Sequence, residues 1–197
     1  NAAIAAMGPV EAVAALREHV ADARVAEKAC GRLWILSLPA GSEQAAAEAG
    51  AIEAVVEAMR AHPQVADVQV NGCLVLGNVC RGDDAAGRAR KQRAADAGAI
   101  EAVVAALRAH PQVAGVQEQA CGALGNVCAG DDAAAAARRQ RAAAAGAIEE
   151  VVAALRAHPQ EENMQMLSCS ALANICGCGS GVRARRRRAT QASGRWW

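Results

Sequence analysis

The chain contains three edited copies of one stretch, and this internal repeat constrains the fold more than any other feature of the sequence. Gly50, Gly98 and Gly146 stand in register at a period of 48 residues, and three His-Pro pairs, three asparagines and a row of cysteines keep the same register. A fixed period of this length is typical of repeat proteins, in which each unit buries its apolar face against its neighbours. The sequence therefore predicts an elongated stack of units.

Within one copy the pattern indicates three helices. Asp83-Asp84 can cap the first helix, because an aspartate side chain accepts hydrogen bonds from the unpaired N–H groups at a helix start. Gly98 stands where a left-handed C-cap would fall, and His110-Pro111 ends the second helix because proline disfavours helical backbone in the residue before it. Apolar residues then recur at helical spacing in the third. We expect these helices at about 84–97, 99–109 and 113–129.

Applied to the whole chain, this pattern predicts an all-α fold with one repeat domain over residues 1–197. We expect unit boundaries at about 1–41, 42–82, 83–130 and 131–178, followed by a terminal helix over 179–197. Gly194 stands one period after Gly146, so the stretch from Ser180 aligns with the first helix of another unit. Trp196 and Trp197 then depart from the pattern, and we expect them either to cover the last interface or to anchor a partner.

Cysteine usage favours a reducing compartment. The chain has 8 cysteines, no Phe or Tyr and 3 Trp, so its core must be built from small and aliphatic side chains. Seven of the cysteines recur at one helical position, or seven residues later on the same helix face: Cys30, Cys73, Cys80, Cys121, Cys128, Cys169 and Cys176. Free cysteine packs as a small hydrophobe, so we interpret these residues as reduced core residues of an intracellular protein.

The glycine that precedes the second helix and the Leu-x-Asn-apolar motif of the third make the chain resemble the armadillo repeat family. The relevant motifs begin at Gly50, Gly98 and Gly146 and at Leu76, Leu124 and Leu172. The resemblance implies a right-handed α-solenoid of about four three-helix repeats plus a terminal helix. It also implies a concave groove, lined by the third helices, that binds extended peptides or other proteins, and a family that is mainly non-enzymatic.

In peptide-carrying relatives the third-helix asparagine hydrogen-bonds the ligand backbone, and Asn78, Asn126 and Asn174 match that position here. One amide offers both a donor and an acceptor, so a purely structural role between neighbouring units is an equal alternative. The tryptophans that nuclear-import relatives carry four residues earlier are replaced by Leu74, Gly122 and Ser170, which argues against importin-like cargo. The predicted partner-binding groove comprises Asn71, Leu74, Asn78, Gln119, Asn126, Ser170 and Asn174.

Basic residues concentrate in the expected first helices. They can form a basic edge made of Arg88, Arg90, Arg93, Arg138, Arg139, Arg141, Arg185 and Arg186. Such an edge would suit an acidic protein, an anionic surface or phosphates, whereas glutamates of the second helices, among them Glu53 and Glu101, are candidate partners that would neutralise it. The overall balance of 21 basic and 20 acidic side chains does not decide between these interpretations.

The sequence shows no arrangement that suggests catalysis. There is no glycine-rich phosphate loop, no nucleophile–histidine–acid set and no paired zinc-ligand spacing, so we expect no enzyme activity, metal or cofactor. No apolar run reaches the roughly 20 residues that a membrane helix needs. We expect a protein-binding scaffold in the cytoplasm or nucleus, with an organelle as a further possibility because the sequence does not begin with Met. The alternatives are a stoichiometric subunit of a large assembly and, third, a binder of nucleic acid or an anionic surface.

Overall fold

The computed structural model describes residues 2–177, and these residues form helices and no strands. The expectations for Arg185, Arg186, the terminal helix and Trp196-Trp197 lie outside the described residues. The helices, in chain order, are α1 (Ala2–Ala5), α2 (Pro9–Glu18), α3 (Ala23–Leu36), α4 (Ser42–Glu48), α5 (Ala51–Ala61), α6 (Ala66–Val79), α7 (Ala85–Asp96), α8 (Ala99–Ala109), α9 (Ala114–Cys128), α10 (Ala133–Ala145), α11 (Ala147–Ala157) and α12 (Glu162–Cys176).

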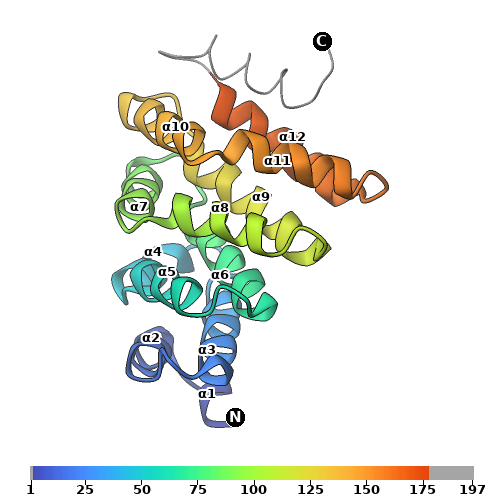
Figure 1. Ribbon diagram of the computed structural model, residues 1–197. Coiled ribbons are helices and arrows are strands. Elements are labelled where there is room, and N and C mark those ends of the chain that lie inside the picture. The colour runs from blue at the N-terminus through green and yellow to red at the C-terminus, as the bar shows by residue number, and fades with distance from the viewer. Residues whose placement is uncertain (1, 178–197) are drawn as a thin grey trace.

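The helices stack in one direction, from α1–α3 at the N-terminal end to α10–α12 at the other (Figure 1). The first helices α4, α7 and α10 lie along one edge of this stack. The third helices α3, α6, α9 and α12 pack on one another in succession, and so do the second helices α2, α5, α8 and α11. This is the predicted α-solenoid. The boundaries and number of its units and the hand of its superhelix stay predictions.

The helix ends follow from the residues that the period repeats. Asp84 and Asp132 each accept a hydrogen bond from the backbone three residues on, at 2.7 and 2.6 Å, and so cap α7 and α10. Gly98 has a φ of +85°, a backbone conformation in which a residue with a side chain would be strained, and it connects α7 to α8. His110 is the C-cap residue of α8, as the His-Pro pair predicts.

A glutamine in each later third helix secures the second helix of the same unit. Gln117 is buried, and its Nε2 donates to the carbonyl oxygens of Leu107 and His110 at 2.8 and 3.0 Å. Gln69 and Gln165 make the equivalent pair of bonds. These side chains satisfy carbonyls at the end of a helix that have no partner within it.

The core runs along the stack and is built from small and aliphatic side chains, as the composition predicts. Ile52, Ile100 and Ile148, one each in α5, α8 and α11, are fully buried, as are Leu76 and Leu124 of the third helices. Apolar burial of this kind is the main favourable term in folding. These buried residues form one cluster that continues from each unit into the next, so the units share a single core.

Candidate functional site

The asparagines of the third helices join one helix to the next. Asn126 Nδ2 donates to the carbonyl oxygen of Gly77 at 2.8 Å, and Asn174 Nδ2 donates to that of Gly125 at 3.0 Å. Asn78 Nδ2 reaches Ser37 Oγ at 3.1 Å. All three asparagines are half-buried. The amide nitrogen of each asparagine therefore forms a hydrogen bond to the preceding unit, as the structural interpretation of these residues expects.

Because the amide nitrogens are held by these hydrogen bonds, the orientation of the amide oxygens is also fixed. Within the described part of the chain, no hydrogen bond is made to the Oδ1 of Asn78 or Asn126. An asparagine oxygen has two lone pairs and can accept from a backbone N–H. The asparagines can thus hold the units together and present an acceptor to a ligand at the same time.

The other predicted groove residues lie on the same helices but are used differently. Asn71 Nδ2 donates to the carbonyl oxygen of Glu27 on α3 at 3.3 Å, and Gln119 Nε2 donates to the neighbouring Glu118 at 3.1 Å. Leu74 is half-buried, and Ser170 is exposed near the end of the described chain. Asn71, one of these four residues, also lines a cavity at the surface of the described helices.

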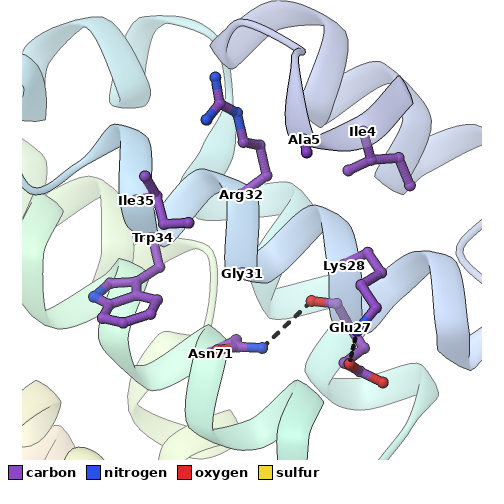
Figure 2. A pocket seen from close by; sticks show the side chains of 9 residues that line it. All are labelled: Ile4, Ala5, Glu27, Lys28, Gly31, Arg32, Trp34, Ile35 and Asn71. Carbon is purple, nitrogen blue, oxygen red and sulfur yellow. Dashed lines mark hydrogen bonds and ion pairs between the residues drawn. The ribbon is translucent and has the colours of Figure 1, made fainter. Parts of the chain in front are cut away.

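That cavity lies at the N-terminal end of the third-helix face and has a volume of about 280 Å³. Figure 2 shows its walls: Ile4 and Ala5 from α1, Asn71 from α6, and the remainder from α3. Glu27 on its rim is paired with Lys28, whose Nζ lies 2.6 Å from Glu27 Oε1. That hydrogen bond is the main cause of a raised pKa at Lys28, so the lysine stays charged.

Trp34 is the functional candidate that the sequence argument overlooked. It is half-buried in the wall of the cavity, beside Ile35, which is 49% exposed. Tryptophan is favoured where a partner is anchored. The available signal was that Trp34 is the single aromatic residue outside the last two positions of the chain.

The predicted basic edge is largely internal. Arg90, Arg138 and Arg139 are only 8, 2 and 5% exposed, so the expectation of an exposed edge is wrong for these three residues. Arg138 Nε donates to Val127 O at 2.8 Å and its Nη2 to Ala129 O at 3.0 Å. Arg90 makes the equivalent bonds to Val79 and Arg81, and Arg139 donates to the carbonyl oxygen of Gly130.

These buried arginines turn inward because the end of a third helix presents carbonyls without intrahelical partners. A guanidinium group can reach two of them at once. Burial lowers the pKa of Arg138 from its usual value. The side chain therefore serves as a clasp between the first helix of one unit and the third helix of the unit before it.

The other arginines of the predicted edge that the structure describes are paired. Arg93 Nε lies 2.6 Å from Glu53, and Arg141 Nε lies 2.5 Å from Glu101, as the alternative of neutralising glutamates expects. Burial alone would raise the pKa of Glu53, but its hydrogen bond with Arg93 is among the contacts that hold the net pKa below the usual value. Arg88 donates to Asp83 O at 2.5 Å and lies 3.7 Å from Asp132. The pairs link successive units.

Six of the seven described cysteines are buried, and all seven are free thiols. Burial raises the pKa of Cys30, Cys80 and Cys128 to about 12, and that of Cys121 to about 11. Cys169 is exposed, contrary to the expectation of a core position. The reason is that its counterpart Cys121 is covered by Ser168 of the following third helix, at 3.4 Å, whereas none of the described helices covers Cys169 in that way.

Residues 2–177 show neither a metal-binding cluster nor a membrane-spanning helix. These residues contain no cluster of His, Cys, Asp and Glu side chains able to hold a metal ion. None of the helices α1 to α12 is both long and apolar enough to cross a membrane.

The stacked helices, their capped turns and the continuous core define an α-solenoid. A family model, the Armadillo/beta-catenin-like repeat, matches residues 89–129, which cover most of α7 and all of α8 and α9. This match supports an armadillo-like repeat protein, as the resemblance of the motifs predicted. Comparisons with curated proteins and with solved structures found no match.

Proposed function

We propose that this chain is a non-enzymatic scaffold that binds an extended segment of a partner protein along the face of its third helices. Armadillo repeats commonly mediate protein–protein interaction, and the family is generally without enzymatic activity. The observation that carries the proposal is the row of asparagines whose nitrogens are tied to the preceding unit while the oxygens of Asn78 and Asn126 accept no bond from described residues.

This arrangement suits an extended backbone. An unpaired N–H of a peptide needs an acceptor when it leaves water, and an acceptor that is already held in place loses little conformational entropy on binding. The asparagine nitrogens supply that restraint, because each is fixed to a neighbouring helix at 2.8–3.1 Å. Specificity for side chains then depends on the surfaces between the asparagines.

The cavity beside Trp34 is the natural place for one side chain of the partner. It combines an indole, the exposed Ile35 and the bare backbone of Gly31 with the polar groups of Asn71 and Glu27. Pockets that bind ligands are mostly apolar with a few placed polar groups. We propose that an apolar side chain of the bound segment enters this cavity.

We also propose a reducing compartment, with the cytoplasm or nucleus favoured. The support is the set of free, buried thiols that pack as core residues. The one edge predicted for nucleic acid is internal or paired at every described arginine, so a protein partner is the better supported proposal.

A peptide array tests the groove. The wild-type chain should bind a subset of extended peptides, and the triple variant Asn78→Ala, Asn126→Ala, Asn174→Ala should lose that binding while keeping its helical circular dichroism. Gln112→Ala changes an exposed loop residue and should bind as wild type does. Equal binding by the triple variant would contradict the role of the asparagines, and no peptide binding by the wild type would favour a subunit of a larger assembly.

A further inference from the structure

Two 16-residue stretches of the chain differ at a single position. Residues 97–112 and 145–160 have the same sequence except that Ala102 in the first is Glu150 in the second. Each stretch forms a second helix, α8 or α11, with the glycine before it and the His-Pro pair after it. The two helices therefore allow one surface to be compared with a carboxylate, at Glu150, and without one, at Ala102.

Where the carboxylate is present, it pairs with an arginine of the preceding second helix. Arg108 Nε lies 2.8 Å from Glu150 Oε1, and Arg108 Nη2 donates to the carbonyl oxygen of Ala145 at 2.8 Å. The side chain of Glu150 is 25% exposed, so it lies largely within the seam between α8 and α11. The interface between α8 and α11 therefore contains a carboxylate, that of Glu150, paired with Arg108.

Where the carboxylate is absent, the equivalent arginine keeps only a weak bond. Arg60 Nη2 lies 3.4 Å from the carbonyl oxygen of Gly98, and no carboxylate of the described chain lies within ion-pair distance of Arg60. Beside it is a cavity of about 190 Å³ between α5 and α8. The cavity is lined by Met59, Arg60, Pro63, Gln69, Ala102, Ala105 and Ala106.

The walls of this cavity match the seam that holds Glu150. One period later they are Leu107, Arg108, Pro111, Gln117, Glu150, Ala153 and Ala154, so the two sets differ only by Met for Leu and Ala for Glu. The cavity beside Arg60 is therefore the space that a glutamate occupies one unit further on. Its walls suit the methylene groups of that side chain, and Arg60 suits its charge.

We propose that the cavity beside Arg60 receives a glutamate side chain of a partner protein, which pairs with Arg60 as Glu150 pairs with Arg108. The site lies mainly between the second helices α5 and α8, with Gln69 of α6 in its wall, and it includes none of the asparagines of the third-helix groove. A partner could engage both surfaces, and two linked contacts bind more tightly than either alone.

The probe for this site is the blocked peptide acetyl-Ala-Glu-Ala-amide, with acetyl-Ala-Gln-Ala-amide as its neutral match. Titrations are followed by the NMR signals of the arginine Nε–H groups in the whole chain. With the glutamate peptide the Arg60 signal should shift and saturate, at a dissociation constant of the order of millimolar. The Arg108 signal should stay in place because that arginine already has its carboxylate. The glutamine peptide should move neither signal.

Two reciprocal variants make the test decisive. Ala102→Glu should place a carboxylate on Arg60 and weaken peptide binding there at least tenfold, whereas Ala102→Gln changes the same site without charge. Glu150→Ala should open an equivalent second site, so that the Arg108 signal also shifts and saturates. An Arg60 shift that does not saturate, that persists in Ala102→Glu, or that the glutamine peptide reproduces would overturn the proposal.

Discussion

At the scale of single residues, the arginines show how far a side chain's role depends on its neighbours along the stack. Arg138 and Arg141 stand three residues apart on α10, yet one is buried on backbone carbonyls and the other is an exposed partner of Glu101. Charge patterning in the sequence identifies both as basic residues of one helix. It cannot show which of them meets the end of a third helix in the unit before.

Arg138→Met should lower the free energy of unfolding by about 2–4 kcal/mol, because the carbonyl oxygens of buried Val127 and half-buried Ala129 would lose their donors. Arg156→Met removes an exposed arginine of α11 and should change stability by no more than about 0.5 kcal/mol. Urea unfolding followed by circular dichroism measures both. Equal effects for the two variants would show that the clasp adds nothing beyond a surface arginine.

The thiols give a second residue-scale prediction. Among the seven described cysteines, Cys169 should react with iodoacetamide in the native protein at pH 8, whereas the buried cysteines should react only after unfolding. The thiolate is the reactive form, and burial keeps Cys80 and Cys128 protonated up to a pKa of about 12. Mass spectrometry of digested, labelled protein assigns the sites. Rapid native labelling of Cys73 or Cys121 would contradict the packing described here.

At the scale of helices, the boundaries follow from local chemistry, and the sequence predicts them well. The aspartate caps, the glycines of positive φ and the histidine C-caps stand where the repeat pattern expects them. The glutamine bonds could not be predicted, because Gln117 reaches the end of another helix, ten residues back in sequence. Such a contact depends on how the two helices are placed against each other, and helix propensity does not determine that placement.

Asp132→Ala should destabilise the protein by about 1 kcal/mol, since the Ala135 N–H at the start of α10 loses its 2.6 Å hydrogen bond. Asp131→Ala removes the adjacent exposed carboxylate, which makes no such cap, and serves as the matched control. The difference between the two unfolding midpoints in urea measures the capping bond together with the exposed Arg88–Asp132 pair at 3.7 Å. A larger loss in Asp131→Ala would mean that the turn before α10 is secured in another way.

At the scale of the whole molecule, the period predicts the solenoid because like residues must meet like residues in each copy. It does not predict what happens at the ends of the stack. Cys169 is exposed on the last described third helix, and the cavity with Trp34 lies on the first. At both ends, the third helix lacks one of the two neighbouring third helices that a helix inside the described stack has.

The buried thiols make the stability of the whole molecule sensitive to alkali. Their pKa values are raised from 9.0 in the unfolded chain to about 12 in the fold for Cys30, Cys80 and Cys128. A raised pKa contributes stability that is full below pH 9 and is lost as the pH rises toward 12. Thermal midpoints should therefore fall over this window. Cys80→Ala should fall less steeply, and an unchanged slope would contradict the linkage.

Most of the hydrogen bonds between units point one way along the chain. Asn126 and Asn174 donate to the third helix before their own, His110 Nε2 lies 2.9 Å from the carbonyl oxygen of Pro63, and Arg138 donates to the end of α9. A newly made chain leaves the ribosome N-terminus first. Most donors between units therefore emerge after the acceptors that they bind, as Asn126 emerges after Gly77, and the molecule can be assembled in the order in which it is translated.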